Sequence, residues 1–244
     1  KYPTTVVSDI TIKKYPTQIK DLLDNIAPKQ HEGSYTSYNV LGQKFIYNEG
    51  INDLFIENPY FIDFRNLFVA NLDTTARLTI CNAPNNINRN APKHHPIHYA
   101  AFNQKYRIWL SDNFKKAFGD ELTPNTQYGA TIPLCMGPLV KLNDEYDDEQ
   151  SHLEAYASIL ETYKQVQNQG DGIKSFTGIL LYLMLDHFCT FLIDEPESFL
   201  HPPQARIMGQ IIGDSLSDQQ QCFISTHSEE IIKGLLEACP QRIK

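Results

Sequence analysis

The sequence predicts an α/β fold in which a mainly parallel sheet is flanked by helices. After residue 169 the apolar pattern alternates helix, strand, helix, strand and helix, which is typical of a parallel sheet. Two short runs, 191–193 and 222–224, are apolar at every position, as expected for parallel strands covered on both faces. The composition is that of an ordinary globular protein, since 41% of the 244 residues are hydrophobic and 20% are charged.

The charge balance and the cysteines restrict the class of protein further. There are 29 acidic and 21 basic residues, so contact with nucleic acid would need a local basic patch. Five scattered cysteines, mostly inside apolar runs, favour buried thiols in a reducing compartment over disulfides or a zinc site. The most apolar stretch, 176–193, is interrupted by Asp186 and His187, so we expect no membrane span. A signal-peptide pattern is also missing, and we expect a cytoplasmic protein.

The first ninety residues are predicted to be rich in strands and to form the N-terminal part of the domain whose core is residues 169–244. Helical spacing is found only at residues 17–26. The strand-like segments are 5–7, 10–12, 44–47, 54–56, 67–70 and 77–81.

Residues 91–168 are predicted to form a helical and β insertion. An Asn- and Pro-rich loop leads into one long helix at 96–118, which Gly119 ends. The histidines of this loop, His94, His95 and His98, have no nearby carboxylate or cysteine and are expected to be solvated rather than to bind metal. The segments that follow are strands at 130–135 and 139–142, an acidic loop at 143–150 and a helix at 153–166. Residues 169–244 then form the core.

Two adjacent carboxylates follow the first buried strand of this core. Asp194 and Glu195 come directly after the run 191–193, and ligands of open parallel sheets bind at the carboxyl ends of strands. Because side chains alternate along a strand, the two are expected to point to different sides. Asp194 is suited to hold a hydrated Mg²⁺, and Glu195 is suited to orient or deprotonate an attacking water.

A histidine follows the second buried strand. The connection between the two strands has the length of one right-handed β-α-β unit, whose helix begins at Pro202. His227 is therefore expected at the same edge as Glu195, where an imidazole can contact a γ-phosphate or the attacking water. Ser228 is placed to cap the next helix.

A glycine-rich helix start precedes the first of these strands. Glycines that open a helix leave backbone N–H groups free, and nearby lysine and serine side chains add to an anion site. This predicts a phosphate-binding segment that contains Gly170, Asp171, Gly172, Lys174 and Ser175. A plain turn is the alternative interpretation.

At these residues the sequence resembles the ABC class of P-loop ATPases, in the soluble branch shared by the SMC, RecF and OLD ATPases. Asp-Glu-Pro at 194–196 is similar to the Walker B motif, Ser-Thr-His-Ser at 225–228 to the switch-histidine segment, and the glycine-rich start to the signature loop. The block Glu-Ser-Phe-Leu-His-Pro at 197–202 resembles the non-transport members. Together with Leu-Asp-Thr-Thr-Ala-Arg-Leu at 72–78, the C-terminal blocks resemble PtuA-type ATPases of Septu and retron antiphage defence.

The resemblance implies an ATPase that uses ATP and Mg²⁺ and dimerises, or forms a higher oligomer, through its ATP sites. Asp194, Glu195 and His227 would act on one nucleotide, while the glycine-rich segment would contact the nucleotide of the partner subunit. An HNH-type nuclease partner (PtuB-like) and, in retrons, a reverse transcriptase with its DNA or RNA are implied as well. The chain departs from the family in lacking any Gly-Lys dipeptide, so we expect the Walker A loop upstream of residue 1.

Two other functions stay open on the sequence. One is a nucleotide-dependent clamp or scaffold with little turnover, and the other is the ATPase part of an OLD-type nuclease with a Toprim domain beyond residue 244. No convincing nuclease cluster is found in these residues.

Overall fold

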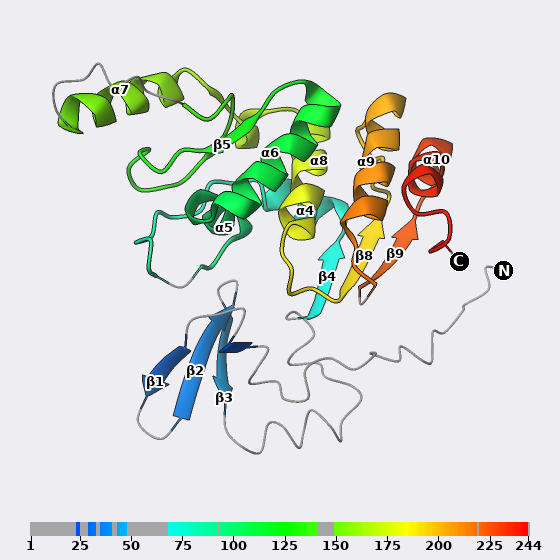
Figure 1. Cartoon of the computed structure of the whole chain (residues 1–244), viewed down its shortest axis with the longest axis horizontal. Coiled ribbons are helices and arrows are strands. Elements are labelled where there is room, and N and C mark those ends of the chain that lie inside the picture. Colours follow the sequence, from blue (N-terminus) through cyan, green and yellow to red (C-terminus); the bar gives the residue numbers. More distant parts are fainter. Residues whose placement is uncertain are drawn as a thin grey trace.

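The computed structural model describes residues 23–24, 29–32, 35–40, 43–47, 68–91, 93–140, 149–218 and 220–243. At its centre β4 (Val69–Leu72), β8 (Thr190–Asp194) and β9 (Gln221–Ser225) form a parallel sheet in the order β4-β8-β9. The three arrows lie side by side and point the same way in Figure 1. Both strands predicted for the core are confirmed as strands, although every residue of β9 is exposed or half-buried. The mixed α/β fold with a parallel sheet flanked by helices is confirmed as well.

Helices pack against one face of this sheet. They are α4 (Thr74–Thr79), α8 (Asp171–Leu183), α9 (Pro202–Ser215) and α10 (Glu229–Ala238). Phe191 and Ile193 of β8 are buried in one core with α8 and α9, whereas Leu192, which points to the opposite face, is 38% exposed. The expectation that both faces of these strands are covered is therefore wrong for the described residues.

Two antiparallel sheets accompany the parallel one. One contains β1 (Lys29–Glu32), β2 (Tyr35–Val40) and β3 (Gln43–Tyr47), and the last of these confirms the strand predicted at 44–47. The other contains β5 (Leu122–Pro124), β6 (Leu134–Met136) and β7 (Lys164–Gln165). The elements predicted at 5–7, 10–12 and 54–56, and most of 17–26, lie outside the described residues.

The segment predicted as a strand at 77–81 is instead mostly helix α4, which follows β4 directly. Asp73 is its N-cap, and one carboxylate oxygen accepts the backbone N–H of Ala76 at 2.8 Å. Arg77 then carries the side chain that fixes the helix on the sheet, as described below. A cap and a tertiary contact thus override the β-propensity of the threonines and isoleucine in this segment.

The long helix predicted at 96–118 is two helices, α5 (Pro96–Phe102) and α6 (Gln104–Phe118). Asn103 interrupts it with an extended backbone, and its side chain accepts the N–H of Lys105 at 2.9 Å, which begins the second helix. The predicted end at Gly119 is confirmed, since this glycine adopts φ 74° and its N–H donates to Lys115.

The remaining differences lie in residues 130–166. The predicted strand at 130–135 begins only at Leu134, because Pro133 has no N–H to donate to a ladder. The helix predicted at 153–166 is α7 (Glu149–Glu161), after which the chain enters β7 and the short 3₁₀ helix η2 (Val166–Asn168). Figure 1 shows α7 at the periphery, away from the parallel sheet.

Glycine allows α4 and α8 to approach each other closely. A Cβ atom at Gly178 would clash with the backbone carbonyl of Arg77, which cannot move without moving the helix. We expect Gly178→Ala to lower the free energy of unfolding by about 1–3 kcal/mol, more than the ~1 kcal/mol that alanine adds as a better helix former. Urea unfolding would measure it.

Gly170→Ala is the control for this prediction, because a Cβ there meets nothing within 4 Å. We expect it to lower the free energy of unfolding by less than about 1 kcal/mol, the usual effect of replacing an N-cap residue by alanine. Equal losses for the two variants would contradict the packing argument.

A buried histidine makes stability depend on pH. His187 is 7% exposed, its ring lies 4.3 Å from that of Phe188, and burial lowers its pKa to about 4. In the unfolded chain this histidine binds a proton below about pH 6.5, so acid favours unfolding. His187 alone is therefore expected to lower the free energy of unfolding by about 2 kcal/mol between pH 7 and pH 5. We expect His187→Phe to make the urea midpoint fall less over this range. A variant with the slope of the wild type would contradict the assignment.

Candidate functional site

The candidate site is the edge at which the three parallel strands end. Because the strands are parallel and Asp194 pairs with Ser225, the segments that follow them emerge together. Asp73 follows β4, Asp194 is the last residue of β8 and Glu195 comes directly after it. His227 lies two residues after β9. The structure therefore brings together the acid pair and the histidine segment predicted from the sequence.

Asp194 is exposed at the end of β8, on the uncovered face of the sheet. A groove of about 490 Å³ runs along this face, with Leu192, Phe223 and Ser225 among its lining residues. Among the described residues, no group of three His, Cys, Asp or Glu side chains is arranged to hold a metal by itself. A single accessible carboxylate nevertheless suits Mg²⁺, which takes one or two protein carboxylates together with water and phosphate oxygens.

Glu195 has already left the strand, so strand alternation does not set its direction. Its φ is 45°, in the left-handed region that side chains other than glycine rarely adopt. The backbone N–H of Glu195 donates to Ser225 at 2.8 Å, and the Ser198 hydroxyl donates to the Glu195 carboxylate at 3.2 Å. The side chain is exposed. The turn, rather than the pleat, therefore directs this carboxylate.

Glu197 connects the segment after β8 to the segment after β9. One oxygen of its carboxylate accepts the Thr226 hydroxyl at 2.8 Å, and the other accepts the backbone N–H of His227 at 2.9 Å. The imidazole of His227 is left exposed at the edge. Sequence analysis gave Glu197 no such role, although its place in the Asp-Glu-Pro-Glu block was the available signal.

The glycine-rich segment begins α8, with Gly170 as N-cap and Asp171 as the first residue. Gly172 faces the turn after Glu195, since a Cβ there would lie 2.5 Å from the carbonyl oxygen of Phe199. Packing alone therefore requires a glycine at position 172. Lys174 forms an ion pair with Asp171 at 2.8 Å, in which the lysine side chain is 21% exposed.

Ser175 does not fit its predicted role. The residue is fully buried inside α8, and its hydroxyl has no hydrogen-bond partner among the described residues. It cannot reach an anion at the surface without a rearrangement of the helix. The accessible part of the predicted anion site is thus the first turn of α8 together with Lys174.

Arg77 is a part of the site that sequence analysis missed. It is fully buried, and its guanidinium donates to the backbone carbonyls of Leu72, Asp194 and Glu195. Burial lowers the pKa of Arg77, while neighbouring carboxylates, led by Asp194 and Asp73, counteract this shift. Its place in the block Leu-Asp-Thr-Thr-Ala-Arg-Leu at 72–78 was the available signal, but that block does not distinguish a buried arginine from an exposed one.

The histidines before α5 are structural. The expectation that they are solvated is wrong for His98, which is 2% exposed and contacts the carbonyl oxygen of Asn85 at 2.9 Å. His95 caps α5 by accepting the N–H of Ile97, and burial lowers the pKa of His95 to about 4. These contacts give His95 and His98 structural roles.

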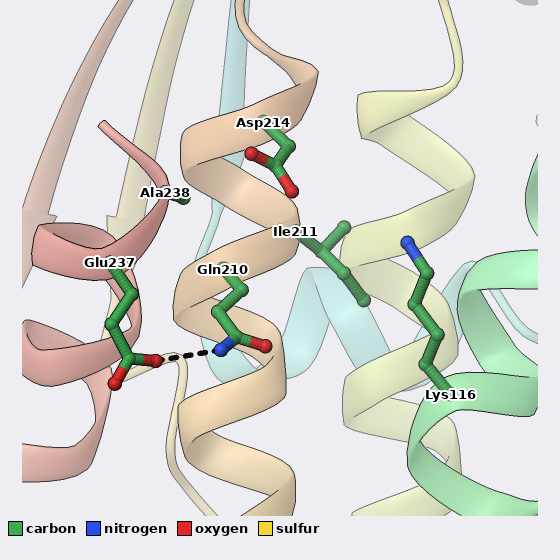
Figure 2. Close-up of a pocket in the computed structure, with 6 residues that line it drawn as sticks. All are labelled: Lys116, Gln210, Ile211, Asp214, Glu237 and Ala238. Atoms are coloured by element: carbon green, nitrogen blue, oxygen red, sulfur yellow. Dashed lines mark hydrogen bonds between the residues drawn. The ribbon is translucent and has the colours of Figure 1, made fainter.

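A second groove, of about 270 Å³, lies between the later turns of α9 and α10 and Lys116 of α6. Figure 2 shows Gln210 of α9 donating to Glu237 of α10 across it, while Asp214 and Lys116 lie nearby. Arg206 also pairs with Glu237. Its lining residues come from the helices and not from the strand ends, so the groove is separate from the candidate site.

The described residues contain no helix long and apolar enough to cross a membrane.

A family model is similar to part of the chain. The model described as “AAA domain, putative AbiEii toxin, Type IV TA system” matches residues 136–233. This range contains α8, β8, α9 and β9, and with them Asp194, Glu195 and His227. Over this range the chain is similar to that AAA domain. None of the curated proteins compared with the chain matches it significantly.

Several solved SMC head structures are similar to the chain. One, studied for ATP-driven dimerization and DNA-stimulated activation of SMC ATPases, shares 13% identity at a TM-score of 0.38, covering 54% of this chain and 72% of that one. An Smc head from Pyrococcus furiosus, with an extended coiled coil and bound to the C-terminal domain of ScpA, shares 13% identity at a TM-score of 0.39. This match covers 57% of this chain and 32% of that one. An Smc head bound to the C-winged helix domain of ScpA shares 12% sequence identity at a TM-score of 0.47, and the match covers 82% of this chain and 58% of that one. The chain thus spans less than two thirds of two of these structures.

The two hydrogen bonds of Glu197 lead to a prediction about stability. We expect Glu197→Gln to lower the free energy of unfolding by about 1–3 kcal/mol, because an amide group can accept only one of the two hydrogen bonds and the other donor loses its partner. Urea unfolding would measure the loss.

Glu229→Gln supplies the matched control, since the Glu229 side chain is 86% exposed and, among the residues that the structure describes, forms an ion pair with Lys233 at 3.5 Å. Such exposed pairs contribute at most about 0.5 kcal/mol. If the two substitutions cost the same, Glu197 does not hold the two segments together.

Proposed function

We propose that this chain is the ATP-binding and ATP-hydrolysing part of an ABC-class ATPase. One observation carries the proposal: Asp194, Glu195 and His227 follow two hydrogen-bonded parallel strands and emerge at one edge of the sheet. All three side chains are exposed there, whereas Phe191 and Ile193 just before them lie in the buried core. Exposed acids and an imidazole at the carboxyl ends of parallel strands are suited to a reaction on a bound ligand.

The three side chains have separate roles in this proposal. Asp194 would hold Mg²⁺, which when bound neutralises charge on the phosphate oxygens. Glu195 would orient a water molecule and take up its proton as the water attacks the γ-phosphorus. His227 would donate a hydrogen bond to a γ-phosphate oxygen. The bond from the γ-phosphorus to the bridging oxygen then breaks, and ADP and phosphate leave.

The first turn of α8 would bind phosphate of a nucleotide held by a second subunit. Free N–H groups and the positive end of the helix dipole favour an anion at Gly170, Asp171 and Gly172. Lys174 is the nearby cation, and it would exchange its ion pair with Asp171 for one with phosphate. The proposal therefore requires a homodimer, or a higher oligomer, for full activity.

The biological setting we propose follows from the resemblance to PtuA-type defence ATPases. In it the ATPase cycle controls an HNH-type nuclease partner in an antiphage complex, together with a reverse transcriptase and its nucleic acid in retrons. The acidic chain suits this division of labour, because at a net charge of −8 it offers little nonspecific affinity for nucleic acid. Nucleic-acid binding is then left mainly to the partners.

The test is ATP hydrolysis by the complete gene product. We expect Glu195→Gln to lower kcat by about 10²–10⁴-fold, the usual contribution of a general base, while ATP binding persists. Asp194→Asn should instead weaken Mg²⁺-dependent ATP binding. Both effects can be separated by measuring steady-state kinetics and nucleotide affinity at several Mg²⁺ concentrations.

Asp186→Asn is the control, because Asp186 is an exposed carboxylate whose side chain contacts Lys105 and Tyr106 and not the strand ends. It should hydrolyse ATP at the rate of the wild type. A Glu195→Gln protein with wild-type activity in defence would favour the clamp or scaffold with little turnover. Wild-type hydrolysis by Glu195→Gln would contradict the proposed site.

A further inference from the structure

Arg77 joins the end of β4 to the end of β8 at the candidate site. Its Nη1 donates to the carbonyl oxygens of Leu72 at 3.3 Å and Asp194 at 2.5 Å. Its Nη2 donates to the carbonyl oxygen of Glu195 at 3.2 Å and to the hydroxyl of Thr74 at 3.2 Å. A single side chain from α4 therefore contacts the backbone of both members of the acid pair, 117 and 118 residues further along the chain.

The backbone that Arg77 holds is the strained part of the turn. Glu195 has φ 45°, which a residue with a side chain adopts at a cost unless its surroundings fix it. Its N–H is bound to Ser225 of β9, and its carbonyl is bound to Arg77. With both ends of the residue fixed, the direction in which the Glu195 side chain leaves the backbone is fixed as well.

Packing alone does not explain an arginine at this position. The guanidinium is fully buried, and burying a charge is costly unless hydrogen bonds compensate for lost water. An apolar side chain would fill the space without that cost, but it would remove the guanidinium donor from the carbonyl of Asp194 and leave the carbonyl of Glu195 with the backbone N–H of Ser198 as its donor. The planar fork of arginine can reach several acceptors in fixed directions, which the single ammonium group of lysine cannot do.

The geometry points to Arg77 as a positioning residue for hydrolysis, one that sets the orientation of Glu195 toward the attacking water without touching the nucleotide itself. This inference rests on the proposed function, because it assigns Arg77 a part in the reaction of that same site. The acid pair lies at the exposed carboxyl end of β8, and Arg77 connects the backbone of this pair to the buried core. Misplacing a catalytic group by 1 Å can cost about 10²-fold in rate.

The experiment compares Arg77→Lys with the wild type in the complete gene product. We expect kcat for ATP to fall about 10–100-fold, while KM stays within about twofold, because the variant misplaces Glu195 and leaves nucleotide binding intact. In a Glu195→Gln background the same substitution should have little further effect, since residues that act as a unit are not additive. Thr74→Val, at a half-buried position, removes the hydroxyl that accepts a hydrogen bond from Nη2 of Arg77 and keeps the arginine itself. It should give a smaller decrease in kcat.

Hydrogen exchange gives a readout apart from catalysis. In nucleotide-free protein, Arg77→Lys should speed amide exchange in the peptide 194–200 at least about tenfold, while peptides from α9 stay protected. A core variant, Phe176→Leu, chosen because Phe176 is fully buried in the same core, reports the effect of lowered stability alone. It should leave both kcat and the exchange of this peptide near wild type at temperatures well below unfolding.

Different outcomes overturn different statements. If Glu195→Gln abolishes hydrolysis while Arg77→Lys retains wild-type kcat, or loses no more than Phe176→Leu, the inference fails and the proposed function stands. If Arg77→Lys leaves exchange of 194–200 unchanged, Arg77 does not hold the segment. If Glu195→Gln leaves hydrolysis unchanged, the proposed function fails, and the role of Arg77 in the reaction fails with it.

Discussion

The candidate site depends on one buried guanidinium and the carbonyl groups that surround it. Arg77 ties the end of β4 to the end of β8, and the N–H of Glu195 ties the same turn to β9. These hydrogen bonds cross all three strands of the parallel sheet at the edge where Asp194 and Glu195 lie. Without them the turn after β8 would be held by the hydrogen bonds inside the turn and by those of Glu197. The backbone of Glu195, with its strained φ, would lose two of the contacts that fix it.

Charge explains why such an anchor is useful at this position. Asp73, Asp194, Glu195 and Glu197 gather around one edge, and like charges that lie close together repel. Arg77 places a positive charge beneath them without occupying the exposed side of the edge. The carboxylate of Glu197 accepts hydrogen bonds from a hydroxyl and a backbone N–H. Asp194 and Glu195, in contrast, are exposed. An arrangement of this kind is ready to receive a cation together with an anionic ligand.

The predictions from the sequence held where a pattern depends on neighbouring residues. The strands at 191–193 and 222–224, the helix start at Pro202, and the cap at Ser228 follow from apolar runs, proline geometry and capping chemistry, and the structure confirms them. Predictions failed where a distant contact decided the outcome. Asp73 and Arg77 convert a strand-like segment into α4, and Asn103 divides a continuous apolar pattern into two helices.

The sequence by itself determined that two short strands end in an acid pair and a histidine segment, because strand length and connection length are local properties. Only the tertiary structure decided that Glu197 binds the histidine segment, that Arg77 holds the backbone of the acid pair, and that Ser175 points into the core. The physical reason is that hydrogen bonds between residues about 30 to 118 positions apart leave no periodicity or spacing in the chain that forms them.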